Sequence, residues 1–523
     1  MRGSRGTRVA ETIMRGAQLD LDTNPSAVAR GGESQVAVRF SGQYSHLAGK
    51  ASSRACLCHG EAALRVCSVV NEVSRRTVLK GIGGLLAAST IALGGLGDAR
   101  AQSGGSDILL ANARLFDGRS ANLVDGLDIL VSGGRIAALV PRGETVAGAR
   151  IIDCTGKVVM PGLIDAHWHS FLAALPQVVA MTADAGYLHL LATEEAERTL
   201  MRGFTTVRDV GGPSFALKRA LDEGRFPGPR IYPSGAMISQ TSGHGDFRAR
   251  FEGPHTGMSP LSPAEDVGIS IISDGVPDML RRTREQLLQG ASQIKIMVGG
   301  GVSSHFDPLD SIQFTDEEIR ASVQAARDWG TYVCAHVYTS TGIARALDCG
   351  VLSIEHGQLA DEEAARRIAD AGAWWSLQPF LSDEDSNPQA SPLARAQQEE
   401  IAEGTVRSFE MALRFGVNTA VGTDILFNPA KTHTQGRQIA KIARFMPNVD
   451  VLRLVTGRNG DLLALSGARN PYPGRVGVIE KDALADLLVI DGNPIDDIEL
   501  IGEPDKMKII MKAGTIHKNT LTA

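Results

Sequence analysis

Short apolar runs separated by turns occupy both flanks of a long middle region in this 523-residue chain. They cover residues 106–160 and return over residues 467–523, with Gly, Asn and Asp between the runs. The run 127–131 is followed by Ser and a Gly-Gly pair, and the run 485–490 by Asp-Gly. Runs of this kind, bounded by turn residues, predict β-strands. We expect the two flanks to pair into one small β-sandwich domain.

The middle region, residues 161–466, follows a different pattern. Short β-branched runs, such as 205–208 and 293–298, alternate with stretches whose apolar residues recur at helical spacing, such as 315–326. The last stretch opens with a Thr-x-x-Glu capping box, which is a signal of a helix N-terminus. Repeated strand–helix units predict an α/β domain with a parallel sheet, and the length favours a (β/α)8 TIM barrel. A doubly wound sheet is the alternative, but no Gly-x-Gly-x-x-Gly follows a first strand.

The composition is that of a soluble globular protein. The chain is 43% hydrophobic and 21% charged, with a formal net charge of -6. A protein that binds nucleic acid usually carries a basic stripe, whereas the basic residues here form only short clusters such as 281–284. We therefore expect no nucleic-acid partner.

Residues 74–101 contain the parts of a bacterial twin-arginine export signal. Arg75 and Arg76 precede an uncharged stretch over 81–97, and an Ala-x-Ala sequence ends at Ala101. A membrane anchor is the alternative, but the apolar stretch is short and rich in glycine for spanning a bilayer. We expect cleavage after Ala101, a periplasmic or secreted mature protein, and no stable membrane anchor.

Residues 1–73 do not fit in front of an export signal, which belongs at an N-terminus. They are polar, rich in arginine and without hydrophobic periodicity. We expect a non-native or disordered extension, with the natural translation start near Val73. A small metal knuckle at 56–59 is the alternative, but it lacks a second pair of ligands.

Candidate chemistry begins at the end of an apolar run, in the sequence Ile-Asp-Ala-His-Trp-His at 164–169. In a β-strand alternate side chains share a face, so His167 and His169 project together. Two imidazoles on one face favour a metal site, since histidine is the commonest metal ligand. The pair could equally be a coincidence or an ordinary hydrogen-bonding cap of the strand.

Four more residues stand at later strand ends, which is where the chemistry of a barrel gathers. They are Lys295, His336, His356 and Asp424. Each has a structural alternative, because a lysine can be solvated at a strand end, a histidine can be a buried core residue and an aspartate can cap a helix. However, burying the charge of a lysine within an apolar run costs free energy, which argues for a functional role of Lys295.

Together these six positions resemble the amidohydrolase superfamily of metal-dependent hydrolases, from about residue 106 to the C-terminus. The resemblance implies two divalent metal ions, with Zn²⁺ as the expected metal. His167, His169 and Asp424 would hold the more buried ion. Asp424 would also act in catalysis, accepting a proton from the attacking water and passing it to the leaving group.

The resemblance assigns the second ion to His336 and His356. It also implies that Lys295 is carbamylated by CO₂ and bridges the two ions. An unmodified ammonium has no lone pair and cannot bind a metal, whereas a carbamate is an anionic oxygen ligand.

Three loops narrow the resemblance to the prolidase-like branch of dipeptidases and carboxypeptidases, which includes ochratoxin-hydrolysing amidases. The segments are 241–246, 298–302 and 336–338. In that branch the residues matching His244 and Tyr338 help to bind the substrate carboxylate or carbonyl. His244 could instead only shape a turn and Tyr338 could pack on the barrel rim. Ser242 stands where the branch commonly has glycine.

We expect hydrolysis of the amide bond to a C-terminal amino acid, in dipeptides or N-acyl amino acids. The partner would be this small-molecule substrate, and the assembly a homo-oligomer. An insert at 247–276 is expected to cover the mouth of the site. A cyclic-amide or ester hydrolase is the alternative within the superfamily, since fold does not settle function. A barrel relative that has lost catalysis is a remote one, because all six metal-competent residues are present.

Overall fold

The computed structural model describes residues 107–252, 260–304, 307–387 and 391–521. The expected twin-arginine signal at 74–101 and the expected extension at 1–73 both lie outside the described residues. Within the described part of the chain, no helix has both the length and the apolar character needed to cross a membrane.

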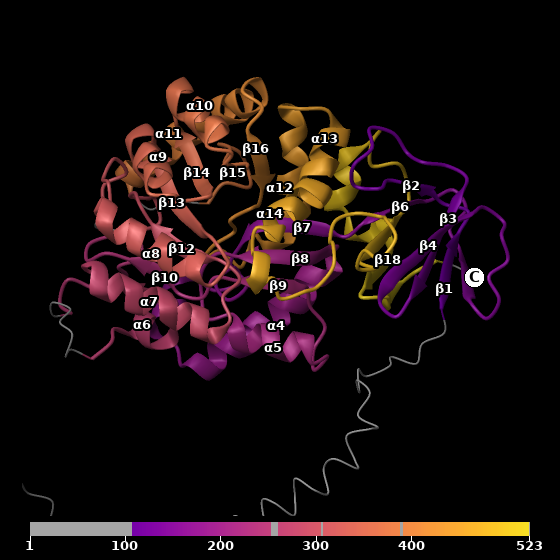
Figure 1. Ribbon diagram of the computed structural model, residues 1–523, viewed down its shortest axis with the longest axis horizontal. Coiled ribbons are helices and arrows are strands. Elements are labelled where there is room, and N and C mark those ends of the chain that lie inside the picture. The colour runs from indigo at the N-terminus through magenta and orange to yellow at the C-terminus, as the bar shows by residue number, and fades with distance from the viewer. Residues whose placement is uncertain (1–106, 253–259, 305–306, 388–390, 522–523) are drawn as a thin grey trace, which may run out of the picture. The chain divides into compact units, whose positions relative to one another are not determined.

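The two flanks of the chain form two sheets. One is four-stranded, in the order β4-β3-β1-β5, and the other is five-stranded, in the order β19-β18-β17-β6-β2. Strand β6 pairs antiparallel with β17, so the two flanks share one sheet, as the indigo and yellow strands of Figure 1 show. The strands are β1 (Ile108–Ala111), β2 (Arg114–Leu115), β3 (Leu127–Ser132), β4 (Arg135–Pro141), β5 (Arg150–Asp153), β6 (Val158–Pro161), β17 (Leu487–Ile490), β18 (Met507–Lys512) and β19 (Thr515–Asn519).

Apolar side chains from both sheets pack into one cluster. Leu110 and Ile129 of the first sheet belong to it, together with Val159, Leu487 and Ile509 of the second. All five are buried. Burial of apolar surface is the main favourable contribution to folding, which explains why the alternating runs of both flanks come together.

The middle region contains parallel strands in two further sheets. One has seven strands, in the order β11-β10-β12-β13-β14-β15-β16, and the other has the order β7-β8-β9. The strands are β7 (Leu163–Trp168), β8 (Phe204–Asp209), β9 (Arg230–Pro233), β10 (Met237–Ser239), β11 (Ser270–Ile272), β12 (Ile294–Met297), β13 (Val333–Thr339), β14 (Ser353–Leu359), β15 (Trp374–Leu377) and β16 (Asn418–Val421).

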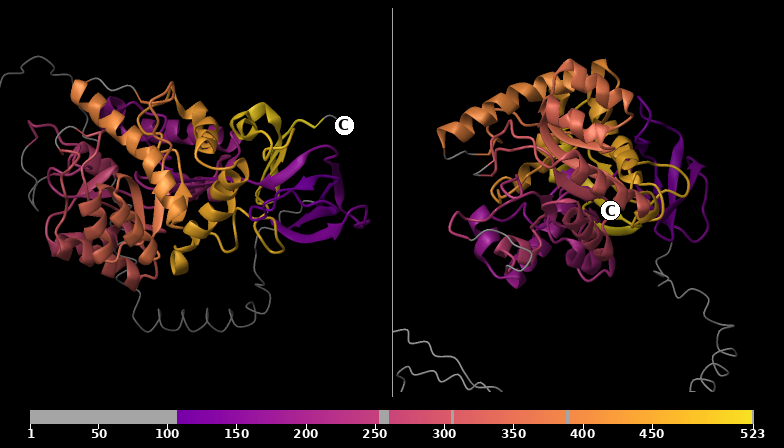
Figure 2. Two further views of the ribbon diagram at one scale, coloured as in Figure 1. Left: turned by 90° about the horizontal axis from the view of Figure 1, so that it is seen from above. Right: turned by 60° about the vertical axis from the view of Figure 1, so that its left-hand side comes forward.

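Helices alternate with these strands along the chain, as the pattern predicted (Figures 1 and 2). The capping box is also confirmed, because Thr315 N donates to Glu318 Oε2 at 2.8 Å and Glu318 N donates to Thr315 Oγ1 at 3.4 Å. The α-helices are α3 (Gln177–Thr182), α4 (Ala185–Met201), α5 (Phe215–Asp222), α6 (Pro263–Val267), α7 (Val276–Gln289), α8 (Asp316–Asp328), α9 (Ser340–Asp348), α10 (Glu362–Asp370), α11 (Pro392–Arg414), α12 (Gln435–Ala440), α13 (Asn448–Arg453) and α14 (Asn459–Ala464).

Hydrogen bonds from two side-chain amides join the two parallel sheets. At the β7–β16 edge, Asn459 Nδ2 donates to Ile164 O at 2.7 Å and to Val421 O at 2.8 Å. On the other side, Gln293 Nε2, just before the inner strand β12, donates to Asp209 O of β8 at 3.0 Å and to Tyr232 O of β9 at 2.8 Å. Side-chain amides therefore tie the two parallel sheets together in two places.

Candidate metal centre

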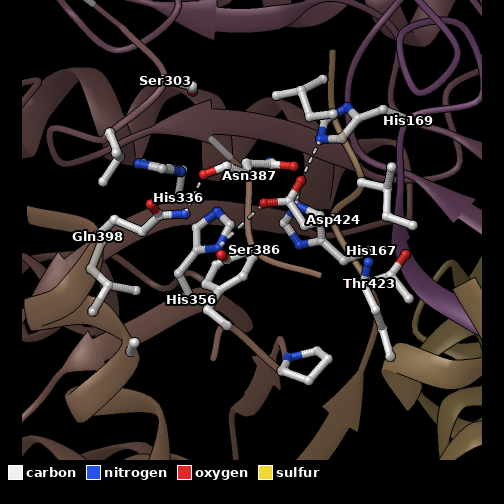
Figure 3. Close-up of a pocket in the computed structure, with 18 of the residues that line it drawn as sticks. His167, His169, Ser303, His336, His356, Ser386, Asn387, Gln398, Thr423 and Asp424 are labelled. Atoms are coloured by element: carbon white, nitrogen blue, oxygen red, sulfur yellow. Dashed lines mark hydrogen bonds and ion pairs between the residues drawn. The ribbon is translucent and has the colours of Figure 1, made fainter. Parts of the chain in front are cut away.

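All eight residues that the sequence singled out line one pocket, shown in Figure 3. They come from β7 and the residue directly after it, from β12, β13 and β14, from the segment after β16 and from the loop after β10. The pocket contains about 1110 Å³ of space free of atoms, its open mouth included. The eight are His167, His169, His244, Lys295, His336, Tyr338, His356 and Asp424.

His167, His169 and Asp424 form the tightest group of possible metal ligands. One ligand atom from each lies within 4.8 Å of the others. Asp424 Oδ1 is 3.1 Å from His169 Nε2 and 3.4 Å from His167 Nε2. Figure 3 shows the two rings turned towards this carboxylate.

Neighbouring oxygen atoms set the tautomers of His167 and His169. They determine which ring nitrogen of each carries a proton and which presents a lone pair to Asp424. His169 Nδ1 lies 3.0 Å from Gly211 O, and His167 Nδ1 lies 2.8 Å from Glu355 Oε2. Carbonyl and carboxylate oxygens only accept, so each Nδ1 donates and each Nε2 keeps its lone pair. Both lone pairs face Asp424 Oδ1, which is buried and accepts no hydrogen bond. Three acceptors that converge without a donor fit a bound cation.

Burial and charge set the protonation of this group. Burial lowers the pKa of His167 to about 4, so the ring is neutral at neutral pH. Burial alone would raise the pKa of Asp424, but His167 and His169 hold it below its usual range. Burial likewise opposes the charge on His169, yet Asp424 raises its pKa. A proton therefore competes for the position that a metal would take between His169 and Asp424.

His336 and His356 also each present one free ring nitrogen. His336 Nε2 lies 3.1 Å from Gly300 O, which leaves Nδ1 as the acceptor. His356 Nδ1 lies 2.8 Å from Gln378 Oε1, whose amide is oriented by a bond from its Nε2 to Ser376 O at 2.9 Å. The ring centroids of the two histidines are 4.5 Å apart. Burial lowers the pKa of both well below the usual value, so both can bind a metal as neutral ligands.

Lys295 lies on β12 with its side chain in the same pocket and is 2% exposed. Burial lowers its pKa. Within the described residues, no hydrogen bond or ion pair occupies its ammonium group. A lysine in this state is disposed to lose its proton, and a neutral amine is the form that adds to CO₂.

Two of the candidate ligands have strained backbones. His356 has a φ of 74° and Asp424 a φ of 51°, in the left-handed region that residues other than glycine seldom adopt. Asp424 N donates to His167 O at 2.9 Å, which ties the strained segment to β7. A Cβ on Gly422 would lie 2.1 Å from His167 N, so only glycine permits this approach.

Sequence reasoning missed the side chains that support the ligands. Arg208 of β8 and Glu355 of β14 are both fully buried, and Arg208 Nη2 donates to Glu355 Oε2 at 2.6 Å. That carboxylate is the one that accepts from His167. Burial alone would raise the pKa of Glu355, but Arg208 holds it well below the usual value. The signal in the sequence was a charged residue inside each of two strands, β8 and β14.

Asp165, treated in the sequence only as a neighbour of the histidines, links β7 to the segment after β16. Thr423 Oγ1 donates to Asp165 Oδ2 at 2.7 Å, and His167 N donates to Asp165 Oδ1 at 3.1 Å. Burial raises the pKa of Asp165 to about 6. The residue thus positions both His167 and the residue before Asp424.

His244 and Tyr338 stand beside the histidines of the second group. The His244 ring stacks on His336 at a centroid distance of 4.1 Å and an interplanar angle of 15°. Its Nδ1 lies 3.1 Å from Asp307 Oδ2. The Tyr338 ring lies 5.1 Å from that of His356. Both side chains are therefore in place to contact a molecule bound at the metal ligands.

The insert at 247–276 contributes α6 and β11, and β11 pairs in parallel with β10. None of its described residues lines the pocket, which is walled instead by the segments after β12, β15 and β16. The expected role of the insert as a cover of the site has no support from the described residues.

The profile of the amidohydrolase family matches residues 158–517. Among characterised proteins, an ochratoxinase of Aspergillus niger is 30% identical over 382 residues, which cover 69% of this chain and 76% of that protein. The metal-competent residues described above all lie within the matched range.

Two solved structures are similar to this chain in both fold and sequence. A prolidase complexed with N-methylphosphonate-L-proline has a TM-score of 0.73 and 32% identity, and the match covers 79% of this chain and all of that one. A Xaa-Pro dipeptidase with methionine bound in its active site has a TM-score of 0.69 and 28% identity, again over 79% of this chain and all of that one.

Proposed function

This chain belongs to the amidohydrolase family, and from that premise we propose that it hydrolyses the amide bond to a C-terminal amino acid in dipeptides or N-acyl amino acids. The names of its relatives, an ochratoxinase, a prolidase and a Xaa-Pro dipeptidase, support a hydrolase of amide or peptide bonds. The observation that carries the proposal is the convergence of two imidazole lone pairs on the unpartnered oxygen of Asp424.

The pocket has enough ligands for two divalent ions. In this proposal His167, His169 and Asp424 hold one, and His336 and His356 hold the other. Lys295, if carbamylated, would supply an anionic oxygen ligand to the metal centre. Neutral imidazoles together with carboxylate oxygens are ligands that suit Zn²⁺. Two bound ions would lower the pKa of a water and polarise the substrate carbonyl.

The residues of the chain supply positioning and proton transfer. Asp424 is ionised and reaches the centre of the pocket, so it can take a proton from the attacking water and deliver it to the leaving amine. His244 and Tyr338 would bind the substrate carboxylate or carbonyl from the side of His336 and His356. Glu355 and Gln378 would hold His167 and His356 in the tautomers that the site needs.

We also propose that the two parallel sheets close into a (β/α)8 barrel and that the flanking sheets form a β-sandwich. The bonds by which Asn459 and Gln293 tie the two sheets together support closure. The shared apolar cluster of the flanking sheets supports the sandwich.

A substrate screen of the zinc-loaded protein tests the function. Members of at least one class, N-acyl amino acids or dipeptides, should be cleaved with release of the C-terminal amino acid, and Asp424→Asn should lower kcat by at least about a hundredfold. Cleavage of cyclic amides or esters, with no release of an amino acid from either class, would contradict the proposal.

A further inference from the structure

One wall of the pocket carries charged side chains that the proposed chemistry does not use. Asp383 and Asp385, from the segment after β15, line it together with Lys441, from the segment after α12. The Lys441 ammonium lies 2.9 Å from Asp383 Oδ2 and 2.6 Å from Asp385 Oδ2. Lys441 is 7% exposed, so these contacts are made largely out of water.

Further cations complete this charged wall. Arg437 Nε donates to Asp385 Oδ2 at 2.9 Å, and Lys431 lies 3.7 Å from Asp385 Oδ1. Arg444 lies 3.5 Å from Asp383 Oδ2, and Glu384 lies 3.5 Å from Lys441. Four cations thus face three carboxylates in this wall, of which Asp383, Asp385 and Lys441 line the pocket. The members of the wall are Asp383, Glu384, Asp385, Lys431, Arg437, Lys441 and Arg444.

The described residues offer no other carboxylate to the pocket except Asp424, which belongs to the metal group. The internal segments outside the described residues, at 253–259, 305–306 and 388–390, contain no aspartate or glutamate in the sequence. Every acidic group that lines the pocket is therefore ion-paired or committed to the candidate metal.

This charge distribution distinguishes the two substrate classes that the proposed function leaves open. A dipeptide carries an ammonium one carbon away from the scissile carbonyl. Placing that charge in a pocket whose carboxylates are all ion-paired or among the candidate metal ligands, beside the Lys441 ammonium, is costly. An N-acyl amino acid has no such charge, and Met297, Phe380 and Ile401 offer its acyl group apolar surface in the same pocket.

We propose that the substrates of this protein are N-acyl amino acids without a free amino group next to the scissile bond, rather than dipeptides with a free N-terminus. The inference rests on the proposed function, and it names the substrate class of the same site.

Matched substrates test it directly. N-acetyl-L-phenylalanine and glycyl-L-phenylalanine differ by one ammonium, as do N-propionyl-L-leucine and L-alanyl-L-leucine. At pH 7 the zinc-loaded full-length protein should have a kcat/KM at least about tenfold higher for the acyl member of each pair. The ratio should shrink as the pH rises past about 8, where an α-amino group loses its proton.

The outcomes separate the two claims. Equal or faster cleavage of the dipeptides at pH 7 would overturn this inference and leave the proposed function standing. No cleavage of any of the four compounds would overturn the proposed function as well.

A pair of variants tests the role of the wall. Lys441→Met removes the cation that lines the pocket and leaves Asp383 and Asp385 less compensated, so the acyl-to-dipeptide ratio should fall several-fold. Lys431→Met removes the same charge from the same wall at a position that does not line the pocket, and it should leave the ratio nearly unchanged. An unchanged ratio in folded Lys441→Met would contradict the inference. The wild-type comparison above remains decisive if that variant does not fold.

Discussion

His167 and His169 present their Nε2 atoms to the same carboxylate because two different oxygens, of a buried glutamate and of a backbone carbonyl, accept a hydrogen bond from their Nδ1 atoms. At the residue scale, this hydrogen-bond direction turns a cluster of histidines into a set of ligands. The spacing of the two histidines and their strand-end position could be predicted. Glu355, Arg208 and Gln378 could not, because their roles depend on strands that are distant in the sequence.

The buried pair of Arg208 and Glu355 should show strong coupling. Arg208→Met or Glu355→Gln alone leaves an uncompensated buried group, and each should lower the free energy of unfolding by about 3–5 kcal/mol. The double variant removes both charges and should lose clearly less than the sum of the two. Urea unfolding of the metal-free proteins measures this, and additive losses would rule the coupling out.

The buried ammonium group of Lys295 should lower the free energy of unfolding of the metal-free protein. Its folded pKa lies below the unfolded value, so the unfolded state binds more protons and stability is lost as the pH falls below about 10.4. Metal-free Lys295→Met should therefore be more stable than the wild type at pH 7, by more than about 1 kcal/mol, and the gain should shrink towards pH 10.

Lys441→Met is the matched control for that experiment. The same substitution at another largely buried lysine removes an ammonium that touches Asp383 and Asp385, which raise its pKa against the effect of burial. It should lower the free energy of unfolding at pH 7. A stability gain in both variants, or in neither, would show that charge burial at Lys295 is not the cause.

At the scale of elements, the alternation of strands and helices in the middle region and the pairing of the two flanks could be read from apolar periodicity. The capping box at the start of α8 was equally visible. The contacts between β7 and β16 could not be predicted from the sequence, because these strands are far apart in it. Their edges are joined by the side-chain amide of Asn459 and by one close backbone approach.

Gly422→Ala tests that close approach. The added Cβ would meet the backbone of His167, which cannot move away as a side chain could. The variant should lose about 1–3 kcal/mol of stability and bind zinc at least about tenfold more weakly, measured by chelator competition.

Gly186→Ala is the control, since Gly186 lies within the first turn of α4 and a Cβ there would meet only the Asp184 carboxylate, at 3.1 Å. Alanine is favoured over glycine in a helix, so stability should be unchanged or slightly higher. Equal zinc affinity in both glycine variants would contradict the packing argument.

At the scale of the whole molecule, we propose that the chain is exported through its twin-arginine sequence. Changing Arg75 and Arg76 together to Lys should leave the protein unprocessed in the cytoplasm of a bacterial host, because the export machinery reads the arginine pair. Fractionation and N-terminal sequencing measure this, with the exposed Arg114→Lys as the control. Normal export of the double variant would refute the proposal.

We propose that one pocket of this chain holds two metal ions, with ligands from β7 and the residue after it, from β12, β13 and β14, and from the segment after β16. Anomalous diffraction at the zinc edge from crystals of the zinc-loaded protein tests this proposal. We expect two peaks, one among His167, His169 and Asp424 and one at His336 and His356, with carbamate density on Lys295. A single peak, or an unmodified Lys295 beside two peaks, would contradict it.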